Sequence, residues 1–322
     1  MKITFIGGGN MATALIGGLK KQGFSAAGMQ VVDPVEETRI RLTESFGVRC
    51  APAIDAAALN CEVLMLAVKP QLMKEALAPA AGKLKDQLVI SIAAGLQVKD
   101  IGRWLGGTAA SYSKLVRSMP NTPALIGAGI TGLYADPSVD HEGRATAEKI
   151  LHAVGRVLWI EDEALMDVVT AVSGSGPAYV FYFIEALQNS GTALGLPAET
   201  ARLLAIETFL GAARLAEASN EPVDDLRMRV TSKGGTTAAA IEVFNTEAVD
   251  AAIAKGVEAA AARGRELCEG ARTPADDFVV DVHAIDPSSN SDDAPDDVGA
   301  GHESLGPAQA VGRRPFNPLR PD

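Results

Sequence analysis

The sequence is poor in cysteine and aromatic residues, and each scarcity excludes a class of protein. The 322 residues contain three cysteines, Cys50, Cys61 and Cys268, whose spacing fits no metal-ligand motif, so we expect no metal. An odd number of cysteines in a chain that enters an apolar run at once, without a secretory signal, indicates reduced thiols in the cytoplasm. Aromatic residues make up 5% of the chain and no basic stripe is present, which argues against nucleic-acid binding.

Long apolar runs are also missing. The longest candidate, residues 168–184, is interrupted by the segment Ser173-Gly174-Ser175-Gly176-Pro177, and a membrane span needs roughly 18 apolar residues. A hydrophobic content of 47% is nevertheless typical of a globular protein, and 322 residues leave room for about two domains. We therefore expect a protein that does not cross a membrane.

The formal net charge of −11 is concentrated at the end of the chain. Residues 274–322 hold ten of the 40 acidic residues, three of the 29 basic residues and seven of the 17 prolines. Such a composition buries too little apolar surface to offset the entropy of ordering. We expect residues 273–322 to form an acidic, proline-rich, disordered tail, and the mild charge of the remainder indicates no cationic partner.

Short apolar runs alternate with helical patterns over residues 1–162. The runs are residues 3–6, 30–33, 63–68, 88–92 and 112–116, with a further candidate at 156–160. Alternating strands and helices predict an α/β fold in which a mostly parallel sheet is covered on both faces. We expect residues 1–162 to form a doubly wound Rossmann domain.

Residues 163–272 are alanine-rich and helical in pattern. Gly195 closes one helical pattern and Pro197 opens the next, as is typical of helix boundaries. A helical unit of this size is too thin to bury its own apolar faces, so we predict an all-α dimerisation and substrate domain. An ordinary monomeric bundle is the alternative.

A glycine-rich segment directly follows the first apolar run and opens a helical pattern. Strand, glycine turn and helix in this order predict a seat for a dinucleotide pyrophosphate at the helix N-terminus. A glycine turn without a ligand is the alternative. The residues that we assign to the cofactor in this segment are Gly7, Gly8, Gly9, Asn10 and Met11.

Asp33 ends the second apolar run. An acid at this place typically accepts a hydrogen bond from the ribose 2′-hydroxyl of NAD and repels a 2′-phosphate, so it favours NADH over NADPH. An aspartate before Pro34 is also a common turn former. Arg39 and Arg41 could offer positive charge nearby.

Three more segments end strands and would line the same crevice, because ligands bind at the carboxyl ends of parallel strands. Lys69 could face phosphate or ribose, or lie in solvent at a turn. The small residues around Ala94 would let a nicotinamide ring approach the backbone. Asn121 lies in a polar turn held by two prolines, which suits a carboxamide or is purely structural. The assigned residues are Ala67, Val68, Lys69, Pro70, Ala94 and Asn121.

Two glycine-rich polar segments lie in the helical half. We expect Ser173–Tyr179 to form a loop close to cofactor or substrate, with Ser175 binding substrate; a helix N-cap is the alternative. Thr231–Thr237 is typical of a helix entrance whose N–H groups and hydroxyls can hold a carboxylate, or of a plain helix cap. The substrate residues assigned here are Ser232, Gly234, Gly235, Thr236 and Thr237.

The four histidines lie away from these motifs. His141 and His152 fall in a helical stretch, and His283 and His302 fall in the tail. A hydroxy-acid dehydrogenase generally needs a general base for its alcohol. An imine reductase does not, because a protonated cyclic imine already carries the positive charge that attracts a hydride.

Six motifs in order, IGGGNMA, AVKPQ, SIAAG, RSMPNTP, SGSGPAY and TSKGGTT, resemble those of the pyrroline-5-carboxylate reductases. The resemblance runs from Met1 to about Gly270. It implies reduction of (S)-1-pyrroline-5-carboxylate by NAD(P)H to L-proline, the last step of proline biosynthesis, by dimers that commonly form a ring of five. It also implies that Thr237 lies near the ring nitrogen, where its hydroxyl orients the imine and could relay a proton, and that the partner subunit completes each site.

The chain departs from the family pattern in places. Asp33 stands where members that favour NADPH tend to have a small polar or basic residue, Ile54 or Asp55 where they often have asparagine, and Lys233 where a proline is common. A 3-hydroxy-acid dehydrogenase is the second candidate, but it would need a catalytic lysine from the helical half, where only Lys233 and Lys255 occur. A non-catalytic dinucleotide-binding scaffold is the third.

Overall fold

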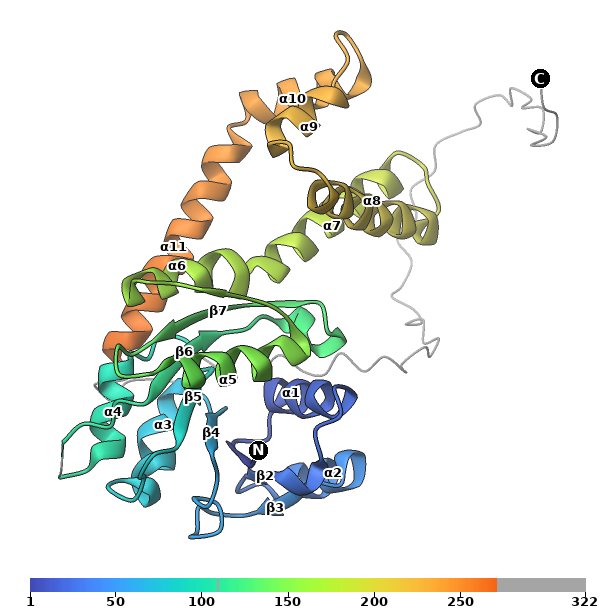
Figure 1. Ribbon diagram of the computed structural model, residues 1–322. Helices are drawn as coiled ribbons and strands as arrows, with labels where there is room; N and C mark the ends of the chain where they lie inside the picture. Colours follow the sequence, from blue (N-terminus) through green and yellow to red (C-terminus); the bar gives the residue numbers. More distant parts are fainter. Residues whose placement is uncertain (109, 271–322) are drawn as a thin grey trace, which may run out of the picture. The chain divides into compact units, whose positions relative to one another are not determined.

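The computed structural model describes residues 1–108 and 110–270 (Figure 1). Strands alternate with helices up to Trp159, and the described chain from Glu163 onward is helical. The strands are β1 (Ile3–Ile6), β2 (Met29–Val32), β3 (Arg49–Ala51), β4 (Val63–Leu66), β5 (Leu88–Ser91), β6 (Leu115–Met119), β7 (Gly129–Ala135) and β8 (Gly155–Trp159). The α-helices are α1 (Asn10–Lys21), α2 (Glu36–Phe46), α3 (Pro70–Leu77), α4 (Val98–Gly106), α5 (His141–Leu151), α6 (Met166–Val169), α7 (Gly176–Ala193), α8 (Ala198–Ala218), α9 (Val223–Arg229), α10 (Thr236–Thr246) and α11 (Val249–Gly270).

The strands of the described residues form one sheet in the order β3-β2-β1-β4-β5-β6-β7-β8. Neighbours from β3 to β6 are parallel, β6 and β7 are antiparallel, and β7 and β8 are parallel. The order reverses its direction between β1 and β4, as in a doubly wound Rossmann sheet. The predicted fold, a Rossmann sheet followed by a helical region, is therefore confirmed.

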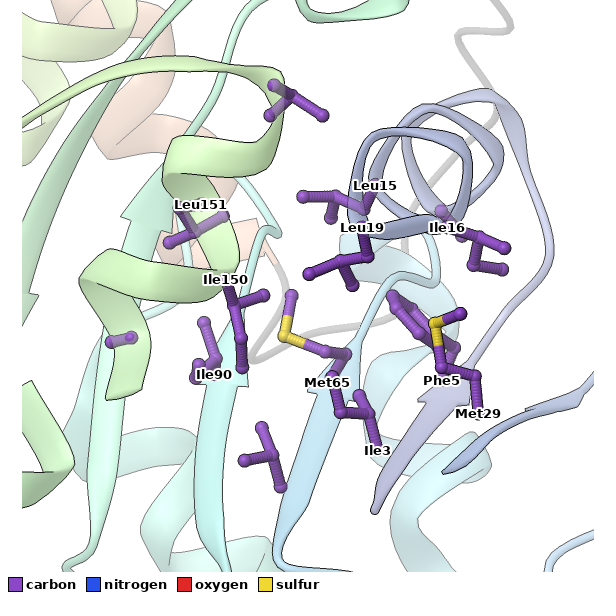
Figure 2. Close-up of a cluster of buried hydrophobic side chains, with 14 of the residues drawn as sticks. Ile3, Phe5, Leu15, Ile16, Leu19, Met29, Met65, Ile90, Ile150 and Leu151 are labelled. Atoms are coloured by element: carbon purple, nitrogen blue, oxygen red, sulfur yellow. The ribbon is translucent and has the colours of Figure 1, made fainter. Parts of the chain in front are cut away.

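Both faces of the sheet are apolar, because successive side chains of a strand point to opposite sides. On one face, strand side chains pack against α1 and α5 (Figure 2). On the other face, the alternate residues of β4 and β5 pack against α3 and α4. Residues of the first face are Ile3, Phe5, Met65, Ile90, Leu15, Leu19 and Ile150; residues of the second are Leu64, Leu66, Val89, Met73, Leu77, Ile101 and Leu105.

Two strands were not predicted, and one lies later than predicted. β3 has three residues, none of them buried, so it carries no apolar signal. β7 contains two glycines and therefore looks like a loop in sequence. β6 covers Leu115–Met119 instead of residues 112–116, because its partners on β5 and β7 place Arg117 inside the sheet. The polar turn that contains Asn121 begins only after Met119.

The segment Ser173–Tyr179, expected as a loop, is helical. Thr170–Gly174 form a π-helical turn that leads into α7. The backbone N–H of Ser175 donates to the Thr170 carbonyl at 2.8 Å, and Ser173 Oγ donates to the Val169 carbonyl at 2.9 Å. These bonds satisfy the polar groups locally, so the glycines do not break the helix. π-helical turns frequently mark functional sites.

The later helices pack mainly as pairs. α7 packs against α8, and α11 contacts α6 and the π-helical turn at one end and α10 at the other. None of the helices that the structure describes combines the length and the apolar character needed to span a membrane. The acidic tail, predicted from residue 273, lies outside the described residues.

Close contact between α1 and the turn after α5 requires a glycine at position 18. A methyl group on Gly18 would overlap the Ala153 carbonyl oxygen and lie 3.0 Å from Val154 Cγ1. We expect Gly18→Ala to lower the free energy of unfolding by about 1–3 kcal/mol, as overpacking typically does, measured by urea denaturation. Gly17→Ala is the matched control, because its methyl group would meet Phe46 at an ordinary 3.4 Å. Equal stability of the two variants would contradict this account of the packing.

Candidate cofactor and substrate site

The carboxyl ends of β1, β4 and β5 meet at one edge of the sheet. Ile6 pairs with Leu66, and Leu66 pairs with Ser91. The Ala67 N–H donates to the Ile6 carbonyl at 2.7 Å, and the Ile92 N–H donates to the Leu66 carbonyl at 3.0 Å. The loops that begin at Gly7, Ala67 and Ile92 therefore start side by side, at the switch point where Rossmann sheets bind ligands.

Gly7 and Gly8 are required by the fold itself. Gly7 has φ +97°, and a Cβ there would lie 2.5 Å from the Ala67 carbonyl oxygen and 2.9 Å from Val68 Cγ1. A Cβ on Gly8 would lie 2.7 Å from Leu42 Cδ1. Gly7 therefore lets the turn pass close to Ala67 and Val68 in the loop after β4, and Gly8 lets it pass close to α2.

The fold does not require a glycine at position 9. Its φ of −69° and ψ of −173° suit any residue, and a Cβ there would meet no atom within 4 Å. Gly9 caps α1, but no side chain bonds the first-turn N–H groups and no acid lies in that turn. By contrast, Asp140 caps α5 through a 2.8 Å bond from the Gly143 N–H. Open space before an uncapped helix N-terminus fits a phosphate anion, with Asn10 and Met11 in the first turn.

Asp33 lies directly after β2 and is 9% exposed. Its Oδ2 accepts a 2.8 Å bond from the Gly8 N–H, and its Oδ1 accepts a 2.9 Å bond from the Val35 N–H. The carboxylate thus joins the ends of β1 and β2, while each oxygen retains a second lone pair for a ribose hydroxyl.

Two arginines of α2 bring positive charge to the same loops. Arg39 Nη1 donates to the Asp33 carbonyl at 2.8 Å and to the Pro34 carbonyl at 2.7 Å. Arg41 Nη2 donates to the Gly8 carbonyl at 3.2 Å. Both guanidinium groups are therefore engaged with backbone oxygens next to the glycine turn.

The remaining residues assigned to the cofactor differ in how deeply they are buried. Lys69 is exposed at the N-cap of α3, and Pro70 is its first residue. Ala94 is half-buried in the loop after β5. Asn121 is 9% exposed; its Nδ2 donates to the Ser173 carbonyl at 3.1 Å, and its Oδ1 accepts from the Ile130 N–H at 3.0 Å. Asn121 thus ties the segment after β6 to the π-helical turn that precedes Ser175.

A second uncapped helix begins at Thr236. Gly235 is the N-cap of α10, and it makes no side-chain capping bond. A Cβ on Gly235 would lie 2.5 Å from Ser232 Oγ, and Gly234 has φ +73°. The turn therefore favours glycine at position 234, and it leaves the first-turn N–H groups and the half-buried Thr237 available to an anion.

Within one chain, the glycine turn before α1 and the glycine turn before α10 do not form one site. In the part of the chain that the structure describes, α10 packs on α11, and the hydrogen bonds of Thr231–Thr237 stay within this segment and its helical neighbours. α10 and the sheet lie at opposite ends of α11 (Figure 1).

A buried charge cluster was missed in the sequence. Arg117, on β6, is 3% exposed and pairs with Asp167 and Glu163. An arginine between apolar residues of a strand is the signal that could have revealed it, since a buried guanidinium requires carboxylate partners. The sequence does not say which acids these are.

A Rossmann sheet with an open helix N-terminus at its switch point, followed by a helical region, defines a nicotinamide-dinucleotide oxidoreductase. The family model "Pyrroline-5-carboxylate reductase dimerisation" matches residues 163–267, and the model "NADP oxidoreductase coenzyme F420-dependent" matches residues 2–95. The chain belongs to the pyrroline-5-carboxylate reductase family, as its relatives show.

Relatives named pyrroline-5-carboxylate reductase align over most of the chain. The one from Pseudomonas aeruginosa is 44% identical over 271 residues, which cover 83% of this chain and 97% of that protein. The one from Haemophilus influenzae is 42% identical, with 82% and 97% covered. A solved reductase from Coxiella burnetii superposes with a TM-score of 0.75 at 41% identity, covering 83% and 98%. A Plasmodium falciparum enzyme with NADP bound gives 0.74 at 27% identity and the same coverage.

Gly9 allows a test of the cofactor seat that leaves the fold intact. We expect Gly9→Ala to raise the Kd for the dinucleotide about tenfold or more, because its methyl group occupies the open space before α1. The thermal midpoint should stay that of the wild type, since the backbone angles suit alanine. Binding is measured by NADH fluorescence, with Gly17→Ala as control. Unchanged affinity in Gly9→Ala would place the pyrophosphate elsewhere.

Proposed function

We propose that this chain reduces (S)-1-pyrroline-5-carboxylate to L-proline with a nicotinamide cofactor. The observation that carries the proposal is the pair of uncapped, glycine-headed helix N-termini, one on α1 and one on α10, in a member of this family. One suits a pyrophosphate and the other suits a small carboxylate. The bound dihydronicotinamide supplies the hydride.

The cofactor lies along the edge formed by the ends of β1, β4 and β5. The pyrophosphate would be held by Gly7, Gly8, Gly9, Asn10 and Met11. Asp33 would accept a hydrogen bond from a ribose hydroxyl. The loop after β4 would also contact the cofactor, through Ala67, Val68, Lys69 and Pro70. Ala94 and Asn121 would contact its nicotinamide end. The backbone approach permitted by Gly7 supports this placement.

The substrate carboxylate binds at the entrance of α10. The carboxylate receives hydrogen bonds from backbone N–H groups and hydroxyls of Ser232, Gly234, Gly235 and Thr236. Ser175, at the start of α7, contacts the substrate ring. Thr237 orients the imine nitrogen and holds or relays its proton. No histidine is required, and the exposed positions of His141 and His152 agree with this. Catalysis comes mainly from alignment of two bound rings.

Each complete site is shared between two subunits. α7, α9 and α10 have no buried residue, and α8 buries only Ala201 and Ala205. Large apolar side chains on these helices are exposed by half or more, and a protein self-associates to cover such a surface. They are Phe181, Tyr182, Leu203, Leu204, Leu215, Val223, Met228 and Val243, together with Val230 directly after α9. We propose a dimer through residues 163–272, which supplies α10 to the sheet of its partner; five such dimers would form the ring.

The cofactor is NADH or NADPH: the family resemblance suggests NADPH, whereas Asp33 favours NADH. The Asp33 carboxylate is held in place by two backbone N–H groups, so a 2′-phosphate would meet a fixed negative charge. Arg39 and Arg41 donate to backbone carbonyls and keep their positive charge, so they act in the opposite direction to Asp33. The cytoplasm stays the location predicted from the sequence.

The direct test is an assay of proline formation from pyrroline-5-carboxylate with NADH and NADPH side by side. Turnover with either cofactor supports the reaction. Absence of turnover with both cofactors would refute the proposed reaction. The alternatives would then be a 3-hydroxy-acid dehydrogenase and a non-catalytic dinucleotide-binding scaffold.

Replacing Asp33 tests the cofactor preference. We expect Asp33→Ser to shift the ratio of kcat/KM for NADH over NADPH toward NADPH by about tenfold, because the charge opposing the 2′-phosphate is removed while one oxygen remains for the Gly8 N–H. Glu44→Gln, near the far end of α2, should leave the ratio unchanged. An unchanged ratio in Asp33→Ser would exclude a ribose-binding role for this residue.

Co-expression of two defective subunits tests the shared site. We expect Thr237→Ala alone to lower kcat/KM for the imine about tenfold without dissociating the dimer, since it removes one hydrogen bond in the transition state. Co-expression of the Thr237→Ala and Gly9→Ala subunits should give about one quarter of wild-type activity. About half of the dimers are then mixed, and each mixed dimer contains one site with neither substitution. Activity no greater than the mean of the two parents would mean that each site is built from one chain.

A further inference from the structure

The buried ion cluster of Arg117 joins β6 to the first helices of the second half of the chain. Arg117 Nη2 donates to Asp167 Oδ1 at 2.9 Å, and Nη1 lies 3.5 Å from Glu163 Oε1. The side chains of Asp167 and Glu163 are 11% and 17% exposed. A buried guanidinium with two carboxylates is held rigidly, because separating any partner leaves a charge without compensation.

Glu163 makes a second contact that the other two residues do not. Its Oε1 accepts a 2.8 Å hydrogen bond from the backbone N–H of Val98, the first residue of α4. The N-cap of α4 is Gln97, whose side chain makes no capping bond. A carboxylate from 65 residues further along the chain therefore caps α4, where the helix dipole favours negative charge.

α4 follows directly on the loop Ile92–Gln97, which starts at the carboxyl end of β5. The loop is fixed at its start by the bond between Ile92 and Leu66, and at its end by Glu163. It contains Ala94, assigned above to the nicotinamide end of the cofactor. Asp167 lies on α6, which continues into the π-helical turn whose Ser173 carbonyl holds Asn121. One cluster thus anchors both backbone segments assigned to that end of the cofactor.

We propose that Glu163 is a positioning residue for hydride transfer. Its carboxylate, held by Arg117, fixes the first turn of α4 and with it the loop Ile92–Gln97, on which the nicotinamide ring lies. The proposal rests on the proposed function, because it takes the nicotinamide end from that assignment. A displacement of reacting rings by about 1 Å lowers the rate by up to about 100-fold, so a residue outside the contact shell can control kcat.

The protonation of Glu163 adds a pH dependence to this role. Burial raises the pKa of the Glu163 carboxyl, whereas the Val98 N–H and Arg117 act in the opposite direction. As the pH falls through this raised pKa, the carboxyl is protonated and its bond to the Val98 N–H loses its charge assistance. The titratable and charged groups that face Glu163 are Arg117 on β6, Lys99 on α4, Tyr134 on β7 and Asp167 on α6, with Asp162 beside it.

Three variants separate positioning from folding. Glu163→Gln keeps an oxygen for the Val98 N–H and removes the charge, and Glu163→Ala removes both. Asp162→Asn is the matched control: Asp162 is exposed, and its Oδ1 accepts a 2.9 Å bond from the Ala164 N–H that asparagine preserves. The measurements are kcat as a function of pH, the Kd for NADH by fluorescence, and amide hydrogen exchange of the cofactor-free protein over residues 92–102.

We expect Glu163→Ala to lower kcat about tenfold with the Kd for NADH changed less than about twofold, since the pyrophosphate seat is untouched. Glu163→Gln should have a smaller effect, and the ratio of wild-type kcat to its kcat should approach unity as the pH is lowered. Exchange over residues 92–102 should be faster in Glu163→Ala and unchanged in Asp162→Asn.

Unchanged kcat in Glu163→Ala, or a loss of kcat matched by an equal loss of folded dimer, would overturn the proposal. Unchanged exchange would overturn it as well, because α4 would then be fixed without Glu163. A wild-type protein without turnover would refute the proposed function instead, and the exchange rates would still decide whether Glu163 holds the first turn of α4.

Discussion

The parallel pairing of β1 with β4 is the constraint on which the site depends. It ends both strands at the same level, so the loops that follow them leave the sheet side by side. The close approach of Gly7 to the Ala67 carbonyl follows from this pairing, and so does the direction in which α1 starts. A side chain at position 7 would overlap the Ala67 carbonyl group and push the two loops apart.

The glycines of the first motif differ in what surrounds them. Gly7 and Gly8 are forced by neighbouring atoms, whereas Gly9 faces open space and has an ordinary backbone conformation. The same distinction applies at α10, where Gly234 and Gly235 shape a turn that leaves the helix without a cap. α5, by contrast, begins with the Asp140 side chain bonded to its first turn. At α1 and α10 the N-cap is a glycine, so no side chain of the cap residue occupies the space before the helix.

Sequence patterns predicted the elements with strong local signals and missed those without them. The four-residue strand β4 is wholly apolar and β1 contains a single polar residue, Thr4, so both were recognised, and so was the helix entrance at Thr236. β7 was missed because its glycines suggest a loop. Their cause is tertiary: a Cβ on Gly132 would lie 2.7 Å from Val169 Cγ1. The π-helical turn was taken for a loop because serines and glycines are common in loops, and only its internal bonds reveal a helix.

The sequence by itself determined the α/β class of the first half, the helical character of the second half, the two glycine-headed helix entrances and the family. These follow from periodicity and from residue types that act within a few positions of one another. Only the tertiary structure decided which distant groups meet. Glu163 caps a helix that begins 65 residues earlier, and Asn121 holds a carbonyl 52 residues later. The physical reason is that a charged or amide side chain has many partners of suitable chemistry along the chain, and sheet register and helix packing select one of them.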